Sequence, residues 1–210
     1  MREPLALVLG EDDIRALVPH PAWDTNKYAR GTVGVVGGSA AYPGAPILAA
    51  SAAARCGAGY VRLVTTSGAT ACAHAHLLSI PVSACDQGIW GTLCATSAIQ
   101  AAQDLAKSDV ILVGPGMGTS DDSERFLEAL SQDRPMVFDA DALTLIARNH
   151  GLLDMPARHP RILTPHEGEA ARLLGRKIAN RNEDALRLYH RLGYDTMSMV
   201  TLRKEFYENR

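Results

Sequence analysis

Two carboxylates separated by one residue follow a short apolar run in the second half of the chain. They are Asp139 and Asp141, and the apolar run is residues 135–138. Carboxylates at the end of a strand can bind Mg²⁺ or accept a proton from a substrate. They can also cap the next helix by accepting hydrogen bonds from its first amides. The spacing favours capping by at least one of them and leaves their chemical role open.

One histidine occupies a similar place after a later apolar run, in the segment Leu-Thr-Pro-His-Glu. Thr164 followed three residues later by Glu167 predicts a capping box, with Pro165 at the first helical position. Helix initiation therefore accounts for these residues but not for His166. An imidazole at that place could donate a hydrogen bond to a substrate hydroxyl or phosphate, or it could be an ordinary surface residue.

Two glycine-rich segments also follow apolar runs. Residues 37–46 read GGSAAYPGAP and residues 114–119 read GPGMGT. Glycine lets the backbone approach a ligand closely, and free amides at a helix start attract anions. The first segment is not a P-loop because no Gly-Lys-Ser/Thr follows, and Thr119 breaks the dinucleotide pattern G-x-G-x-x-G in the second. Either segment could cradle a ligand or form a plain tight turn.

Short apolar strands that alternate with helices must position these residues. The apolar runs predict strands at residues 32–36, 60–65, 109–113, 135–138 and 161–163, and helices at residues 45–55, 92–105, 121–131, 140–149 and 165–174. Such alternation is typical of a parallel α/β sheet. Ligands of these sheets bind beyond the carboxyl ends of the strands, which is where the candidate residues stand.

The composition disfavours several classes of partner. The 210-residue chain carries 21 basic and 23 acidic residues, so no basic excess indicates a nucleic acid partner. No stretch approaches the roughly 20 apolar residues of a membrane span. The apolar run at the N-terminus is short and is followed at once by Glu11 and Asp12, which argues against a signal peptide. We therefore expect a cytoplasmic protein without nucleic acid or membrane partners.

Four motifs together resemble one known family. In chain order they are GGSAAYPGAP with GAGYV downstream, DVILVGPGMG, VFDADAL and ILTPHEGEAARLLG. This order resembles the NAD(P)H-hydrate dehydratases, which have a ribokinase-like fold, over residues 27–175. The resemblance implies a three-layer α/β sandwich with a mostly parallel central sheet.

The resemblance also implies an activity, the repair of damaged NADH or NADPH that carries a hydroxyl on its reduced nicotinamide ring. The family uses ATP or ADP, with Mg²⁺, to phosphorylate that hydroxyl. Phosphate then leaves and the ring double bond is restored. Carried onto this chain, the resemblance places Ala45, Gly116 and His166 against the hydrate. Further residues that could line the site are Gly38, Gly44, Gly118, Asp139 and Asp141.

The family pattern stops after Gly175. The resemblance implies a later strand ending in Lys-Gly and then a Gly-Thr-Gly-Asp at a helix start, which supplies the anion hole and the presumed base. No Gly-Asp pair follows Gly175 in this sequence. The chain therefore offers no identifiable catalytic residue, and its metal ligands are unknown. We interpret residues 1–175 as an incomplete ribokinase-like core and residues 176–210 as an atypical tail.

The tail resembles a different family over a short stretch. Residues 182–206 are similar to the last helix and strand of a GNAT acetyltransferase, but the glycine-rich acetyl-CoA loop of that family is absent. An amphipathic helix and a strand that cover an exposed sheet edge are the simpler interpretation.

Three hypotheses of function follow. The chain is an active hydrate dehydratase that receives the missing group from another residue or a partner chain. Alternatively, it is a non-enzymatic remnant that binds nucleotide or only folds and associates. The third hypothesis is a small-molecule kinase of the same fold, which the GPGMG and LTPHEGE motifs disfavour. The absent Gly-Asp pair favours impaired catalysis, and we expect a homo-oligomer.

Overall fold

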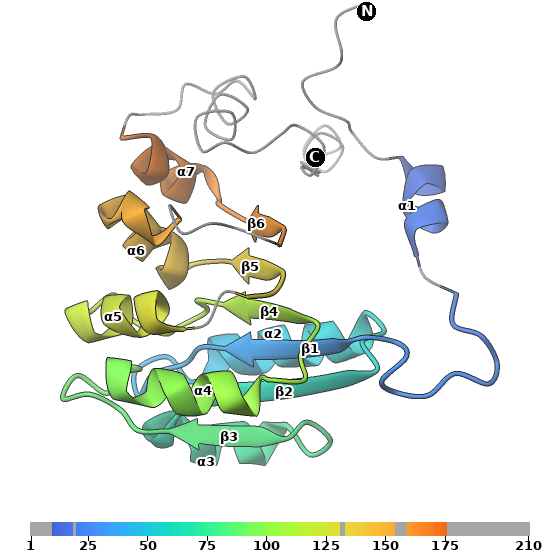
Figure 1. The fold of residues 1–210 in the computed structure, drawn as a ribbon, viewed down its shortest axis with the longest axis horizontal. Helices are drawn as coiled ribbons and strands as arrows, with labels where there is room; N and C mark the ends of the chain where they lie inside the picture. Colours follow the sequence, from blue (N-terminus) through green and yellow to red (C-terminus); the bar gives the residue numbers. More distant parts are fainter. Residues whose placement is uncertain (1–9, 19, 131–132, 154–158, 176–210) are drawn as a thin grey trace, which may run out of the picture.

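A single parallel sheet organises the chain. The computed structural model describes residues 10–18, 20–130, 133–153 and 159–175. Its six strands are all parallel and lie in the order β3-β2-β1-β4-β5-β6 (Figure 1). The predicted α/β class is confirmed, and the tail at residues 176–210 lies outside the described residues.

The strands and helices alternate along the chain. The strands are Thr32–Val36 (β1), Tyr60–Thr66 (β2), Val82–Cys85 (β3), Val110–Val113 (β4), Met136–Phe138 (β5) and Arg161–Leu163 (β6). The α-helices are Glu11–Leu17 (α1), Gly44–Arg55 (α2), Ser67–His76 (α3), Ala98–Asp104 (α4), Asp121–Ala129 (α5), Asp141–Arg148 (α6) and Glu167–Leu174 (α7), with short 3₁₀ turns at Ala95–Ser97 and His150–Leu152. No helix among the described residues is long and apolar enough to span a membrane.

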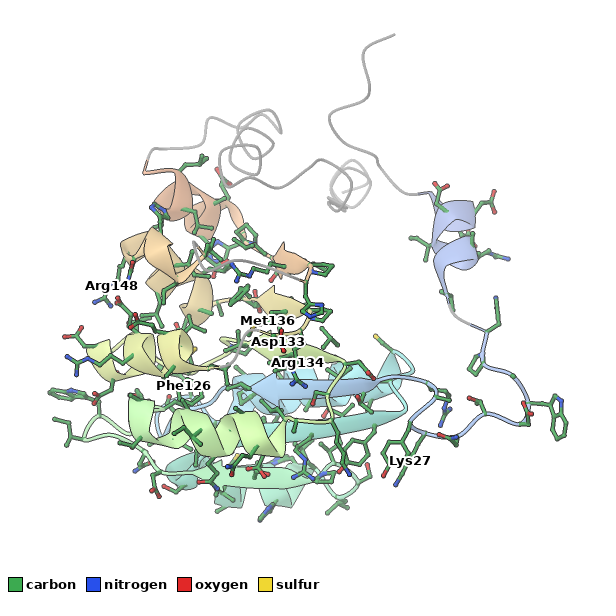
Figure 2. The ribbon with its side chains drawn as sticks, in the orientation of Figure 1. Lys27, Phe126, Asp133, Arg134, Met136 and Arg148 are labelled. Atoms are coloured by element: carbon green, nitrogen blue, oxygen red, sulfur yellow. The ribbon has the colours of Figure 1, made fainter. Side chains whose placement is uncertain are left out.

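Helices cover both faces of the sheet and give three layers (Figure 1). On one face, Val35 and Leu63 pack with Ile47 of α2 and Ala73 of α3. On the other face, residues of β4, β5 and β6 pack with α4 to α7, and Phe126 of α5 lies inside this second cluster (Figure 2). Val35 and Val36 belong to different clusters because successive side chains of a strand point to opposite faces.

Most predicted elements are present, but three predictions near the site need correction. The helix expected at residues 92–105 begins later, at the 3₁₀ turn that starts with Ala95, because Thr92 and Leu93 belong to a loop. The helix expected from Pro165 begins at Glu167. The helix α3 and the strand β3 were not predicted, since residues 67–85 have a weak apolar pattern.

The topology brings the four candidate segments together at the carboxyl ends of the strands, which we call the carboxyl edge of the sheet. They follow β1, β4, β5 and β6, which are consecutive neighbours in the sheet. The chain leaves β1 for the face covered by α2, and it leaves β4 for the face covered by α5. The carboxyl ends of β1 and β4 therefore form the topological switch point where such sheets bind ligands.

At the amino ends of the strands, the carboxylate of Asp109 links β1 and β4. The Thr32 amide donates to Asp109 Oδ2 at 2.7 Å, and the Thr32 hydroxyl lies 2.7 Å from the same oxygen. These hydrogen bonds to Thr32 hold the pKa of Asp109 below its ordinary value of 3.8. A lowered pKa stabilises the fold above about pH 3.8, and this stabilisation is lost as the pH falls through the folded-state pKa.

We expect Asp109→Asn to lower the free energy of unfolding by about 1 kcal/mol at pH 7. The loss is small because solvent screens the exposed carboxylate. Urea unfolding at pH 7 and pH 3 would measure the difference, which should shrink at pH 3. Asp24→Asn, in the exposed loop before β1, is the matched control. An equal loss of stability at both pH values would contradict the assigned role of the Asp109 charge.

Candidate functional site at the carboxyl edge of the sheet

Backbone hydrogen bonds join the strand ends at the switch point. The Gly38 amide donates to the carbonyl of Pro115 at 2.9 Å, and the Gly114 amide donates to that of Val36 at 3.1 Å. A Cβ on Gly37 would lie 2.3 Å from the Pro115 oxygen. The loops after β1 and β4 can therefore approach this closely only because residue 37 has no side chain.

Gly116 faces the start of α2. Its φ is +66°, and a Cβ there would lie 2.7 Å from the carbonyl oxygen of Tyr42 and 3.5 Å from the Cβ of Ala45. The structure thus brings two of the predicted site residues, Ala45 and Gly116, together across the switch point. Gly44, at the first position of α2, has open space beside it.

The other glycines are required by packing within the protein. At Gly38 (φ +84°) a Cβ would lie 2.4 Å from Thr65 Oγ1. At Gly118 (φ +87°) it would lie 2.4 Å from Thr92 Cγ2. Both positions shape the edge by allowing close contacts between loops, which a side chain in this backbone conformation would prevent.

Asp139 and Asp141 both accept hydrogen bonds from neighbouring loops. Asp139 Oδ1 accepts from the hydroxyl of Thr164 at 2.8 Å, which links the ends of β5 and β6. Asp141 Oδ2 accepts from the amide of Gly118 at 2.9 Å, which ties the loop after β4 to α6. The N-cap of α6 is Ala140 and it carries no side-chain cap, so the prediction that an Asp caps this helix is wrong. The carboxylate oxygens instead accept hydrogen bonds from groups in other loops.

Ala140, between the two carboxylates, has a strained backbone. Its φ of +49° and ψ of −115° lie in a region that residues with a side chain rarely adopt, and no other non-glycine residue among those described has a positive φ. The flanking ties at Asp139 and Asp141 hold it there. Strain of this kind persists where surrounding contacts over-determine the backbone, and it clusters at functional sites.

His166 is the N-cap of α7. Its Nδ1 accepts from the amides of Gly168 at 3.0 Å and Glu169 at 3.4 Å, so the neutral ring carries its proton on Nε2. The Glu169 carboxylate accepts from the His166 amide at 2.9 Å, which completes a capping box. The predicted box of Thr164 and Glu167 is therefore wrong by two residues. Thr164 instead lies within hydrogen-bond distance of Asp139 and of the Phe138 carbonyl.

The second ring nitrogen of His166, Nε2, faces the Glu169 carboxylate on an exposed side chain. It lies 3.3 Å from Glu169 Oε1, and the histidine side chain is 68% exposed whereas the glutamate side chain is 9% exposed. The imidazole is thus fixed through Nδ1 while Nε2–H can reach a ligand. His166 follows β6, whereas Gly116 follows β4 and Ala45 lies in α2. Two hydrogen bonds link these loops indirectly. Thr164, after β6, donates to Asp139, and Asp141 accepts from Gly118 in the loop after β4.

The described residues do not form a dedicated metal site. They contain no cluster of three His, Cys, Asp or Glu side chains that could hold an ion. One carboxylate oxygen of Asp139 and one of Asp141 already accept hydrogen bonds from the protein. The Mg²⁺ implied by the resemblance could therefore find at most the remaining oxygens of Asp139 and Asp141 in this part of the chain. Magnesium in nucleotide enzymes is often held largely by substrate phosphates and water.

Sequence reasoning missed two residues of this edge. Tyr42 lies directly beside Gly116, and its presence in the GGSAAYPGAP motif was the available signal. Thr92 packs on Gly118, and its Oγ1 lies 2.9 Å from the Oγ of Ser120, the N-cap of α5. No local pattern distinguishes Thr92, because its contacts are with residues far away in the sequence.

We expect Ala140→Gly to raise the free energy of unfolding by about 1 kcal/mol, since glycine adopts this backbone conformation without strain. Thermal or urea unfolding would measure the change. Ala52→Gly, at an exposed position inside α2, is the control and should lower stability by about 1 kcal/mol. A destabilised Ala140→Gly variant would show that Ala140 is not strained.

Comparison with known proteins places this edge in a family context. The profile of the NAD(P)H-hydrate dehydratase family matches residues 33–206, which includes all four loops and extends past Gly175. The chain is 37% identical over 169 residues to a bifunctional NAD(P)H-hydrate repair enzyme of Salinibacter ruber and 34% identical over 169 residues to that of Escherichia coli. These alignments cover 79% and 80% of this chain but 31% and 30% of the relatives, so the chain spans about a third of their length.

Solved structures show the same fold. A ribokinase-like superfamily protein from Enterococcus faecalis superposes with a TM-score of 0.74 at 22% identity, over 92% of this chain and 66% of that one. The ADP/ATP-dependent NAD(P)H-hydrate dehydratase of Bacillus subtilis, co-crystallised with ATP and Mg²⁺, superposes with a TM-score of 0.63 at 23% identity, over 89% and 59%. The family profile covers most of the sequence, including the loops after β1, β4, β5 and β6, and the chain therefore belongs to the NAD(P)H-hydrate dehydratase family.

Proposed function

We propose that this chain binds hydrated NAD(P)H at the switch point for nucleotide-dependent dehydration, and that its own turnover is severely impaired. The observation that supports binding is the pairing of Ala45 and Gly116 across the ends of β1 and β4. Their pairing brings the loop after β4 against the start of α2, and we propose that the hydrated nicotinamide ring binds beside this contact. His166, at the end of β6, supplies a hydrogen-bond donor at the same edge.

The residues perform distinct parts of this task. The Nε2–H of His166 can donate to the ring hydroxyl of the hydrate or to the phosphate that replaces it. Gly116 and Ala45 would line the place where the ring binds, and Asp141 holds the Gly116 loop through the amide of Gly118. The nucleotide supplies the phosphoryl group, whose transfer to the hydroxyl makes a better leaving group. Departure of phosphate with loss of a proton from the neighbouring carbon restores the double bond.

The support for impaired turnover comes from the sequence after Gly175. No Gly-Asp pair follows that residue, although the family motif implies one for the base and anion hole. Each such group is typically worth about 10²–10⁴-fold in rate. ATP or ADP and Mg²⁺ remain the proposed co-substrate and cofactor. We also propose a cytoplasmic homo-oligomer, in keeping with exposed apolar residues such as Leu48 and Ile99.

We expect the purified chain, given hydrated NADH, Mg²⁺ and either ATP or ADP, to recover reduced-nicotinamide absorbance at least about 10²-fold more slowly than the Bacillus subtilis enzyme. Calorimetry should still detect binding of the hydrate. Turnover equal to that of the Bacillus enzyme would show that another group replaces the missing carboxylate. Absence of hydrate binding would contradict the proposed function itself.

We expect Gly116→Ala and His166→Ala each to weaken hydrate binding by about tenfold, through a clash with the Tyr42 carbonyl and loss of the Nε2 donor. His166→Asn separates binding from folding, because asparagine is a good N-cap but lacks Nε2. The matched control is His159→Ala, because His159 precedes β6 at the amino ends of the strands, away from the proposed site. If His166→Asn binds the hydrate as tightly as wild type, His166 acts only as a cap.

A further inference from the structure

A short loop beside the switch point displays an exposed tryptophan. Residues 86–93, which we call the Trp90 loop, connect β3 to the 3₁₀ turn before α4. Gln87 and Leu93 pair at its base, and the Gly91 amide donates to the Gly88 carbonyl at 2.9 Å. Ile89 and Trp90 are therefore the central residues of a tight turn. Trp90 is 73% exposed and Ile89 is 90% exposed.

The Trp90 loop is tied to the carboxyl edge at several points. The Gly91 carbonyl accepts from the Ala40 amide at 3.0 Å, and the Gln87 side chain accepts from the Gly68 amide at 3.0 Å. At its far end Leu93 is fully buried and Thr92 contacts both Gly118 and Ser120. The indole is thus presented on a fixed support, which lowers the entropy cost of stacking a ligand on it.

A pocket opens between Trp90 and the start of α5. It is lined by Trp90, Ser120, Asp121, Asp122 and Arg125. The lining carries two carboxylates and one guanidinium, and Arg125 lies 3.8 Å from Asp122. This balance disfavours a phosphate in the pocket. An aromatic face with carboxylate and hydroxyl acceptors instead suits a planar heterocycle joined to a diol, the chemistry of a nucleoside.

A second arginine orders the same region from α6. Arg148 donates to the Thr119 carbonyl at 2.6 Å and lies 3.3 Å from Asp121 Oδ1 (Figure 2). It therefore holds Asp121 beside the end of the loop after β4. Because Asp121 is oriented by a neighbouring helix, the carboxylate is positioned before any ligand binds.

The pocket lies within reach of the proposed hydrate site. Gly116 is two residues from Gly118, which contacts Thr92, and Thr92 is two residues from Trp90. With about 3.8 Å between successive Cα atoms, the two places are separated by roughly 20 Å or less along this route. A dinucleotide consists of two nucleosides joined through a pyrophosphate, so it could occupy both places at once.

We propose that the pocket beside Trp90 receives the adenosine half of the dinucleotide, with adenine stacked on the indole and the ribose hydroxyls donating to Asp121 or Asp122. The identity of the dinucleotide rests on the proposed function. The nicotinamide half then lies toward Gly116, and the pyrophosphate lies between the two, outside the acidic pocket.

Tryptophan fluorescence tests this proposal without requiring turnover. The chain has two tryptophans, and Trp23 is 98% exposed, so Trp23→Phe leaves Trp90 as the only tryptophan, which can be excited selectively over the tyrosines. NAD⁺ carries the same adenosine half as the hydrate and should quench this emission saturably. Nicotinamide mononucleotide, which lacks adenosine, should not. The Trp90→Phe variant, which retains Trp23, should show no saturable change with either compound.

Calorimetry provides the second readout. Base stacking on an aromatic side chain is worth about 1–3 kcal/mol, so Trp90→Ala should weaken NAD⁺ binding by about 5- to 150-fold. Ile89→Ala, at the neighbouring exposed position, should leave binding unchanged.

Three results would overturn the adenosine assignment. The first is the absence of saturable quenching of Trp90 by NAD⁺, and the second is equal quenching by nicotinamide mononucleotide. The third is quenching by ATP and AMP but not by NAD⁺, which would assign the pocket to the co-substrate. Hydrate binding with an unresponsive Trp90 would reject only the pocket. Quenching by NAD⁺ without any hydrate binding would reject only the proposed function.

Discussion

The close approach of two backbone loops at the switch point sets the geometry of the whole carboxyl edge. The loop after β1 lies against the loop after β4 so tightly that a Cβ on Gly37 would lie 2.3 Å from the Pro115 carbonyl oxygen. The Gly38 amide donates to that oxygen, and this hydrogen bond satisfies a carbonyl that would otherwise be buried without a partner. This contact places Gly116 against Tyr42 and Ala45. The proposed binding surface therefore depends on backbone packing more than on reactive side chains.

The two carboxylates of this edge contribute to the structure of the site through hydrogen bonds to neighbouring loops. Asp141 holds the glycine loop after β4 through Gly118, and Asp139 holds β6 beside β5 through Thr164. Between them Ala140 keeps a positive φ that no other described residue with a side chain shares. A strained residue held from both sides is consistent with an edge that is preorganised before ligand binding. The Trp90 loop extends the same ordered surface toward α5.

The sequence predicted the strands better than it predicted the helix starts. The runs before Gly37, Gly114, Asp139 and Thr164 are short, apolar and closed by a turn residue, and each forms a strand. Helix starts depend on which acceptor reaches the free amides. Ser120 caps α5 by accepting from the amide of Ser123, whereas at α7 the imidazole of His166 takes the place predicted for Thr164. Thr164 was unavailable because its hydroxyl bonds across to β5, and that contact has no signature in the local sequence.

The sequence by itself determined the parallel α/β class, the order of the four motifs and the family to which they belong. The class follows from hydrophobic periodicity and from glycines at turns, which are encoded locally, whereas the family follows from the resemblance of the four motifs and from the match of the family profile. Only the tertiary structure decided that Ala45 and Gly116 meet, that Asp139 and Asp141 act as ties, and that Trp90 stands beside α5. The physical reason is that a side-chain donor or acceptor has several possible partners. Strands and loops far apart in the sequence choose among those partners when the sheet brings them together.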